Sequence, residues 1–254
     1  MIKVLVNGAL GRMGRTVVAA VKADADLELV GMVDAFAGEV DGMKVETNLD
    51  AALKKFAPEV MVDFTRPDVV FQNVLTALEN KVSPVVGTTG LSDDAKEKIR
   101  EAAERNQTPA FIAPNFALGA VLMMLTAQKI AKYMPDVEII ELHHDKKLDA
   151  PSGTAELTAK MISEVRTPHK QGHPEEVENL PHVRGADFDG IKIHSVRLPG
   201  YVAHQEVIFG GLGQTLTIRH DSIGRDSFMP GVVLACKKVR NLRGLTIGLD
   251  KLLD

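Results

Sequence analysis

The chain is poor in cysteine and has no long apolar segment. Its single cysteine, Cys236, excludes an internal disulfide framework and is typical of a reducing compartment. No apolar run approaches the ~18 residues that a membrane-spanning helix needs. Residues 1–4 lead directly into a strand-like segment and lack the features of a signal peptide. The sequence therefore predicts a cytoplasmic protein that does not enter a membrane.

A long basic run is also absent, and the formal net charge is −4 at pH 7. Nucleic acid is therefore not expected as a partner, and an anionic ligand must be held by local positive groups. The chain has 254 residues, of which 45% are hydrophobic and 25% charged. This composition is typical of a globular protein, and the length suffices for one large domain or two modest ones.

Short apolar, β-branched runs alternate with helical segments in the first part of the chain. Strands are predicted at residues 2–6, 27–33, 60–64, 83–86 and 110–113, and helices at 12–23, near 50–56, from 65–67 onward and after Ser92. Strands separated by helices predict a parallel sheet that is covered on both faces. The fold class expected for residues 1–115 is therefore α/β.

The pattern changes after Pro114. An apolar helix at 117–133 precedes a strand at 137–143, a helix that begins near 153 and a polar surface loop at 167–187. Three β-rich runs then follow without helices between them, at 191–197, 204–209 and 214–221, and predict an antiparallel meander. Helix returns from Asp226. We therefore expect a central α+β domain at 116–225 with a mixed or antiparallel sheet, and a first domain completed by 226–254.

Three glycines separate the first predicted strand from the first helix. Gly8, Gly11 and Gly14 form a G-x-x-G-x-x-G string, one residue off the commonest dinucleotide fingerprint. Glycines at this place allow a backbone to approach a pyrophosphate at the helix N-terminus. Asp34 ends the second strand, where an acid accepts from ribose hydroxyls. The alternatives are a glycine-rich turn without a ligand and a solvated loop acid.

Two further loops follow predicted strands, at residues 87–90 and 113–116. Ligands bind at the carboxyl ends of strands in open α/β sheets, so both loops are candidates to contact a dinucleotide. Phe116 either packs against a nicotinamide or is a core residue at a domain boundary. The predicted cofactor-binding residues are Gly8, Ala9, Gly11, Arg12, Met13, Asp34, Gly87, Thr88, Thr89, Ala113, Asn115 and Phe116.

The densest group of reactive side chains lies at residues 141–154. It holds His143, His144 and Lys147, followed by Ser152-Gly153-Thr154 at a helix start. A histidine, a lysine and the N–H groups of a helix N-terminus suit proton donation to a substrate that carries carboxylates. The spacing offers no third or fourth metal ligand, so no metal site is predicted. The alternative is a solvated polar loop before a capped helix.

These motifs resemble the dihydrodipicolinate reductase family in their order and spacing. The segment 143–154 is the most specific part, and the likeness covers nearly the whole chain. It extends to His194-Ser195-Val196-Arg197, Gly200, His204-Gln205-Glu206 and Arg225. The resemblance implies a Rossmann-like dinucleotide-binding domain and a central domain that binds substrate and builds a homotetramer. It also implies NAD(P)H-dependent reduction of 4-hydroxy-tetrahydrodipicolinate, a small cyclic dicarboxylate, to tetrahydrodipicolinate in lysine and diaminopimelate biosynthesis.

The same resemblance implies roles for individual residues. His143 is expected to donate a proton, and Lys147 to assist protonation and hold the substrate. His144 is expected to contact substrate, and Gly153 and Thr154 to bind a carboxylate. Ser152 is a further candidate for the same carboxylate because it opens the helix with them. Closure of the two domains is expected to bring the reduced nicotinamide and the substrate together.

The cofactor is expected to be NADH or NADPH. Family members often carry Arg directly after the ribose acid, where it meets a 2′-phosphate, and Ala35 stands there in this chain. NADH is therefore expected to serve at least as well as NADPH, unless Arg12 or Arg15 compensates. Two rival functions remain open: another Rossmann-type reductase, and a catalytically silent NAD(P)-binding regulator on the same fold.

Overall fold

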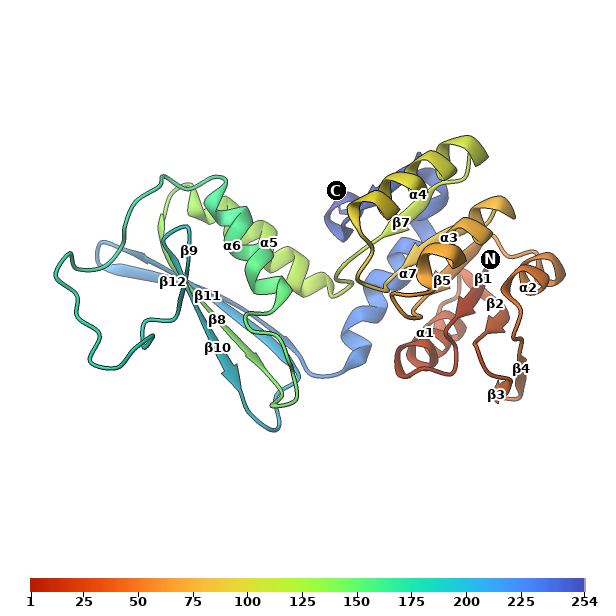
Figure 1. The fold of residues 1–254 in the computed structure, drawn as a ribbon, viewed down its shortest axis with the longest axis horizontal. Coiled ribbons are helices and arrows are strands. Elements are labelled where there is room, and N and C mark those ends of the chain that lie inside the picture. Colours follow the sequence, from red (N-terminus) through yellow and green to blue (C-terminus); the bar gives the residue numbers. More distant parts are fainter. Residues whose placement is uncertain (254) are drawn as a thin grey trace. The chain divides into compact units, whose positions relative to one another are not determined.

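A computed structural model describes residues 1–253. The chain divides into two compact units, Met1–Leu118 with Arg225–Asp254 and Gly119–Gly224. Figure 1 shows a sheet with helices in each unit. Among residues 1–253, no helix is long and apolar enough to cross a membrane.

The first unit contains a six-stranded sheet in the order β13-β7-β6-β5-β1-β2. All of its pairs are parallel, as predicted. From β1 the chain passes to β2 on one side and then to β5 on the other, so a topological switch point lies at β1. The strands are β1 (Ile2–Asn7), β2 (Leu27–Val33), β5 (Val60–Asp63), β6 (Ser83–Val86), β7 (Ala110–Ile112) and β13 (Leu245–Ile247).

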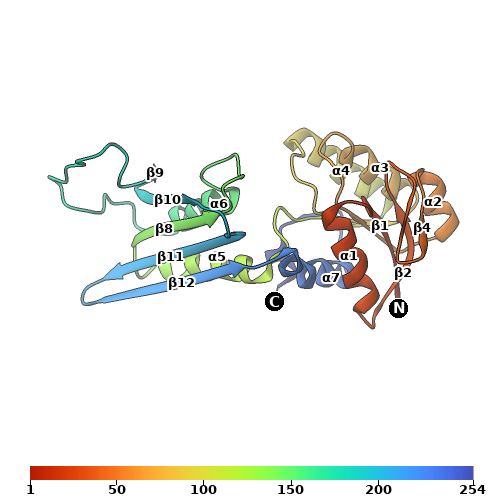
Figure 2. The same ribbon diagram turned by 90° about the horizontal axis from the view of Figure 1, so that it is seen from below.

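Helices cover both faces of this sheet, as Figure 2 shows. Helix α1 packs beside α7, while α3 packs between α2 and α4. Helix α1 buries Val17, Val18 and Val21, which share one face because Val21 lies four residues after Val17 and three after Val18. The helices are α1 (Arg12–Ala23), α2 (Leu49–Phe56), α3 (Val70–Glu79), α4 (Asp93–Asn106) and α7 (Met229–Lys238), with short 3₁₀ helices η1 (Arg225–Phe228), η2 (Val239–Asn241) and η3 (Leu249–Leu252).

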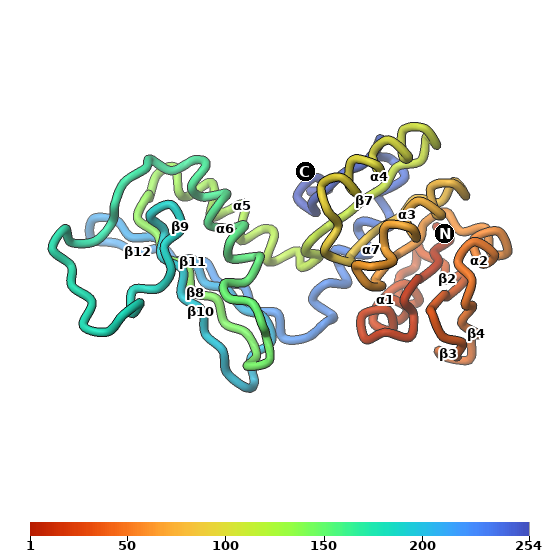
Figure 3. The backbone as a smooth tube through the Cα atoms, in the orientation of Figure 1, coloured from red at the N-terminus to blue at the C-terminus, as the bar shows by residue number. Residues whose placement is uncertain are grey.

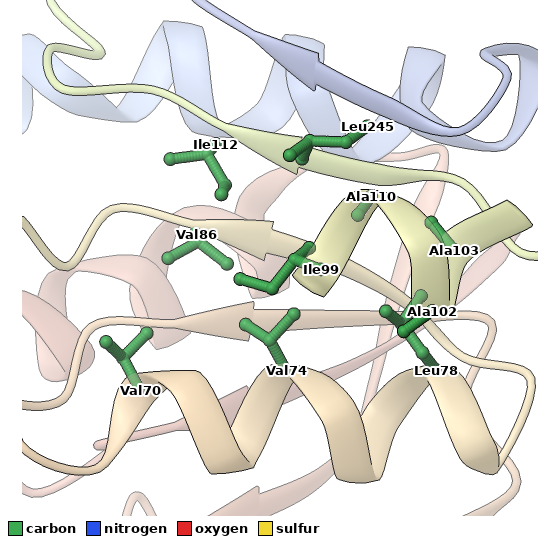
Figure 4. Packing of buried hydrophobic residues seen from close by; sticks show 10 residues of the cluster. All are labelled: Val70, Val74, Leu78, Val86, Ile99, Ala102, Ala103, Ala110, Ile112 and Leu245. Carbon is green, nitrogen blue, oxygen red and sulfur yellow. The ribbon is translucent and has the colours of Figure 1, made fainter. Parts of the chain in front are cut away.

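One buried cluster joins α3 and α4 to strands β6, β7 and β13 of the sheet (Figure 4). Helix α3 contributes Val70, Val74 and Leu78, which recur every four residues along one face. Leu245 from β13 lies in the same cluster, so the carboxyl-terminal strand shares the core of the first unit. The full cluster comprises Val70, Val74, Leu78, Val86, Ile99, Ala102, Ala103, Ala110, Ile112 and Leu245.

The helix predicted from Thr65-Arg66-Pro67 begins later, at Val70. Thr65 is held outside the helix because its N–H and its hydroxyl both bond to one Asp63 oxygen. The Arg66 carbonyl then accepts from the N–H groups of Val69 and Val70 and closes a turn. The expected helix start is therefore wrong by one turn.

Two elements of the first unit were not predicted from the sequence. A short hairpin, β3 (Gly38–Val40) and β4 (Met43–Val45), forms within the loop after β2. Strand β13 forms in the tail, where only helix was expected. All three strands have three residues, which is too short for a periodic pattern to be recognised.

The second unit contains a five-stranded mixed sheet in the order β12-β11-β8-β10-β9. Strand β11 pairs antiparallel with β12 and β8, while β8 and β10 are parallel. The predicted α+β class with a mixed sheet is confirmed, but the predicted simple meander is wrong because β8 lies between β10 and β11. The elements are β8 (Asp136–His143), α6 (Gly153–Ser163), β9 (Ala186–Phe188), β10 (Ile191–Arg197), β11 (Ala203–Gly211) and β12 (Gln214–Ser222).

The crossover through α6 explains this strand order. A parallel neighbour needs a long connection, and α6 together with residues 164–185 provides it between β8 and β10. Figure 3 shows the part after α6, residues 164–185, as an irregular loop. A loop was predicted at 167–187, and its last two residues belong to β9, which pairs at the edge with β10.

Helices lie against one face of the second sheet. On that face Ile139 pairs with Ile193 on one side and Val207 on the other, and all three are buried. Helix α6 contacts β8 and β10, and Gly119 of α5 (Leu118–Ala131) lies against His220 of β12. The opposite face carries a different set of apolar side chains, Ile140, Leu142, Val196 and Ile208.

We expect Ile99→Ala to lower the free energy of unfolding by about 2–5 kcal/mol, because it leaves a cavity in the cluster of Figure 4. Ile247→Ala is the matched control, because Ile247 lies in the same unit but is 36% exposed. Urea unfolding measures both variants. Equal losses in the two would contradict the assignment of Ile99 to the core.

Candidate active site

The glycine loop folds back on itself between β1 and α1. Gly8 has φ 83°, and its carbonyl accepts from the Gly11 N–H at 3.1 Å. A Cβ at Gly14 would lie 1.9 Å from the Gly8 oxygen, so no side chain fits there. The close turn places the N-terminus of α1 directly beside the end of β1. This arrangement forms a backbone cradle of the kind that holds phosphates.

Asp34 follows β2 and is fixed against the same loop. The Leu10 N–H donates to its Oδ2 at 2.9 Å. The carboxylate is half-buried and does not extend freely into solvent. This geometry favours the ribose-binding interpretation over a solvated loop acid.

A cavity of 590 Å³ opens at the carboxyl ends of β1, β2 and β5. Its volume lies in the usual range for sites of small molecules and cofactors. Gly8, Gly11 and Asp34 line it together with Phe36 and Arg66, which sequence reasoning had not singled out. The other lining residues are Asn7, Leu10, Val33, Ala35, Thr47, Leu49, Phe64, Thr65, Val69 and Asn73.

The buried carboxylate of Asp63 holds the loops at this edge of the sheet. Its Oδ1 accepts from the Thr65 hydroxyl at 2.7 Å and from the Thr88 hydroxyl at 3.0 Å. Its Oδ2 accepts from the amides of Asn7 at 2.8 Å and Asn73 at 3.0 Å. The ends of β1, β5 and β6 are thereby joined. The sequence signal was an acid inside a predicted buried strand, and it had not been used.

The loop after β6 packs tightly against Phe64. A Cβ at Gly87 would lie 2.1 Å from the Phe64 ring, so a glycine is required there. Thr88 is buried and its hydroxyl is engaged by Asp63, while Thr89 is exposed. Thr88 therefore positions the loop, and Thr89 is accessible to a ligand.

The loop after β7 has a different character. The Phe116 side chain is 2% exposed and packs on Phe64 and Phe111 at ring-centroid distances of 5.8 and 6.0 Å. This packing favours the core interpretation of its side chain over a nicotinamide contact. Asn115 Oδ1 accepts from the Ala117 N–H and turns the chain toward α5.

The remaining predicted cofactor residues differ in exposure. Arg12 is exposed on the first turn of α1, and Met13 beside it is half-buried. Ala9 and Ala113 are buried, so only their backbone can face a ligand.

In the second unit, Glu141 and His143 point to the same side of β8 because they are two residues apart. His143 Nδ1 lies 2.5 Å from Glu141 Oε2. Arg197, which lies opposite His143 on β10, donates to both Glu141 oxygens at 2.7 and 2.9 Å. The Ser152 N–H donates to Glu141 Oε1 at 3.3 Å. Sequence reasoning had not assigned a role to Glu141 or to Arg197.

The Glu141 side chain is fully buried. Burial by itself raises the pKa of Glu141, but hydrogen bonds from His143, Arg197 and Ser195 outweigh it and lower the pKa to about 2. Glu141 is therefore an anion at neutral pH. The sequence signal was an acid at an inward-facing position of an alternating strand.

The loop after β8 carries the predicted substrate residues. Lys147 Nζ donates to both oxygens of Asp149 at 2.8 and 2.7 Å. The hydrogen bond from Lys147 is the main reason why the pKa of Asp149 is lowered. His144 is exposed. Arg197 also donates to the Asp149 carbonyl at 2.8 Å, so the loop is tied to the Glu141 cluster.

Helix α6 begins where predicted, at Gly153. The Ser152 hydroxyl accepts from the Ala155 N–H at 3.2 Å and caps the helix. Gly153 is exposed, and open space surrounds the position of a Cβ there. Thr154 follows in the first turn, and its carbonyl accepts from Thr158 at 2.7 Å.

Within the part of the chain that the structure describes, no three His, Cys, Asp or Glu side chains come together as a set of metal ligands. Cys236 is a buried free thiol in the first unit.

Two family models match the chain. The dihydrodipicolinate reductase N-terminus model matches residues 2–116, and the C-terminus model matches residues 119–253. The 4-hydroxy-tetrahydrodipicolinate reductase of Desulfitobacterium hafniense is 52% identical over 100% of this chain and 99% of its own length. That of Halalkalibacterium halodurans is 51% identical over the full length of both chains.

Solved structures agree with these matches. A dihydrodipicolinate reductase from Paenisporosarcina sp. TG-14, solved with dipicolinate bound, has a TM-score of 0.93 at 46% identity and full coverage of both chains. An amine dehydrogenase from Mycobacterium smegmatis, with a TM-score of 0.65 at 12% identity over 96% of this chain and 94% of its own, shares the fold alone. Because the two models together match nearly every residue and relatives share half of the sequence, the chain belongs to the dihydrodipicolinate reductase family.

Proposed function

We propose that this chain catalyses the NAD(P)H-dependent reduction of 4-hydroxy-tetrahydrodipicolinate to tetrahydrodipicolinate. The observation that carries the proposal is the His143–Glu141–Arg197 cluster at the end of β8. Glu141 accepts from the Ser152 N–H at the start of α6, and Arg197 donates to the carbonyl of Asp149, the residue paired with Lys147. The relatives with matching sequence along the whole chain are named for this activity. The corresponding place in metabolism is lysine and diaminopimelate biosynthesis, in the cytoplasm.

The first unit supplies the dinucleotide site in this proposal. The pyrophosphate lies on the backbone at Gly8, Gly11 and Arg12, and Asp34 accepts from the adenosine ribose. Two observations support a dinucleotide here: the backbone of Gly14 packs closely on Gly8, and one 590 Å³ cavity is lined by both the glycine loop and Asp34. The bound nicotinamide supplies a hydride. Thr89 and the backbone at Ala113 and Asn115 complete the proposed contacts.

The second unit supplies the proton and the substrate contacts. His143 donates a proton to the substrate ring, and Lys147 adds a positive charge beside it. A carboxylate of the substrate replaces Asp149 on Lys147 or lies at the start of α6, where Gly153 and Thr154 present N–H groups and Ser152 holds the turn. His144 contacts the substrate from the exposed side of the loop.

The two rival functions make different demands on this cluster. A Rossmann-type reductase for another substrate needs the glycine loop but not the lysine and the helix N-terminus near a histidine. A silent regulator needs neither His143 nor Lys147, and this chain retains both. The proposed reductase uses all of them.

A homotetramer built through the second unit is part of the proposal. The face of its sheet away from the helices carries Ile140, Leu142, Val196 and Ile208, which are partly exposed in one chain apart from Leu142. Symmetric association covers such a face and removes the apolar surface from water. The alternative is a monomer in which the loop predicted at residues 167–187 folds over the sheet.

We expect His143→Gln and Lys147→Ala to lower kcat by ~10²–10⁴, the usual contribution of a general acid. Dinucleotide affinity should be unchanged, because both residues lie outside the first unit. Nicotinamide oxidation with freshly generated substrate measures kcat, and fluorescence titration measures affinity. Lys146→Ala is the matched control, since Lys146 is the exposed neighbour without a proposed role. Full turnover in the His143 variant would refute the proposal.

NADH is expected to serve at least as well as NADPH, because Asp34 repels a 2′-phosphate and Ala35 offers no compensating charge. The ratio of kcat/KM for the two cofactors measures the preference. Ala35→Arg should raise kcat/KM for NADPH more than for NADH. A preference of the unmodified enzyme for NADPH above about tenfold, ~1.4 kcal/mol, would contradict this account and point to Arg12 or Arg15.

Light scattering at micromolar concentration should give four times the chain mass of 27.5 kDa. Ile208→Lys places a charge on the apolar sheet face and should shift the mass toward smaller species. A single species of one chain mass for the unmodified protein would exclude assembly. A dimer would be consistent with burial of the apolar sheet face but would exclude the tetramer.

A further inference from the structure

Several donors converge on the Glu141 carboxylate, Ser195 among them. His143 Nδ1 contacts one oxygen at 2.5 Å, Arg197 spans both oxygens, and the Ser152 N–H reaches the other oxygen. Glu141 is fully buried, while the His143 side chain keeps 14% of its surface exposed. The carboxylate therefore cannot reach a ligand itself, whereas the imidazole can.

We propose that Glu141 is the positioning residue for His143: it keeps a proton on Nδ1 and so makes Nε2 the nitrogen that donates to the substrate. This inference rests on the proposed function, because it assigns the way in which His143 serves as proton donor. The tautomer of a histidine is set by the bond that its other nitrogen makes, and a carboxylate partner fixes the N–H on its own side.

Arg197 makes this arrangement possible. A buried carboxylate without a cation takes up a proton and then no longer attracts the imidazole N–H. The bidentate pair keeps Glu141 charged, in agreement with its pKa of about 2. The pair joins two neighbouring strands, because Arg197 lies on β10 in register with His143 on β8.

The other elements near His143 place few additional charged side chains around it. Strand β11 places Ala203 opposite His143 and Gln205 opposite Glu141, both uncharged. The following loop brings Lys147, which is paired with Asp149. Glu141 is thus the anion in direct contact with the imidazole, and its loss makes the protonated ring harder to form.

The proton transfer balances simply. The Nε2–H bond breaks, its electron pair stays on the imidazole, and the proton goes to the substrate ring as the ring accepts a hydride. The C4–O bond of 4-hydroxy-tetrahydrodipicolinate also breaks, and the hydroxyl leaves as water, so that the product is tetrahydrodipicolinate. His143 is left neutral with its remaining proton on Nδ1, still directed at Glu141. Solvent then restores the proton on Nε2.

The first test compares Glu141→Gln with Glu138→Gln. Glu138 lies on the same strand and also contacts a histidine and an arginine, His194 at 2.8 Å and Arg184 at 2.6 Å, but it points to the other face. The alkaline limb of the kcat profile should move to lower pH by about one unit in the Glu141 variant. It should stay in place in the Glu138 variant.

Two results would overturn the positioning role. One is an equal loss of activity at every pH in Glu141→Gln, which would mean that Glu141 contributes only to the structure. The other is an equal displacement of the limb in Glu138→Gln.

The second test measures the unmodified protein and does not depend on turnover. Nitrogen-15 NMR of the unmodified protein above neutral pH should show the neutral His143 ring protonated on Nδ1, with the signal assigned by its loss in His143→Gln. A ring protonated mainly on Nε2 would overturn the inference. If His143→Gln keeps full turnover while the Nδ1 tautomer is observed, the proposed function fails and the positioning contact stands.

Discussion

A carboxylate can be buried only where hydrogen bonds replace its water, and this constraint organises both units of the chain. In the first unit Asp63 is enclosed by hydroxyl and amide donors from three strand ends and α3. In the second unit Glu141 is enclosed by Arg197, His143 and a backbone N–H. Each carboxylate accepts hydrogen bonds from segments that are far apart in the sequence. The need to pair one buried charge with donors therefore fixes the positions of the candidate residues.

The two buried carboxylates differ in the kind of donor that binds them. Asn7, Asn73 and Thr88 are neutral and do not titrate, so Asp63 holds a fixed scaffold beside the glycine loop of residues 8–14. Glu141 is held by a permanent cation on one side and a titratable ring on the other. The first arrangement suits a site that must keep its shape, and the second suits a site through which a proton passes.

Local sequence patterns were sufficient to predict the α/β fold class, because the spacing of apolar residues distinguishes strands from helices. They could not give the strand order of the second sheet, since periodicity says nothing about which strands pair. The same limit hid Arg197 as the partner of Glu141, which lies 56 residues earlier. Phe116 was ambiguous for another reason: a lone aromatic after a strand suits a ring-binding site and a core equally, and only its contacts with Phe64 and Phe111 distinguish them.

Strand β13 closes the edge of the first sheet by pairing with β7, although the whole second unit lies between them in the sequence. During synthesis, β7 therefore leaves the ribosome long before its neighbour exists. Its free edge is open to pairing with other chains throughout that interval. The order of translation thus places the whole second unit between β7 and its partner, and the sheet of the first unit is finished only when β13 emerges.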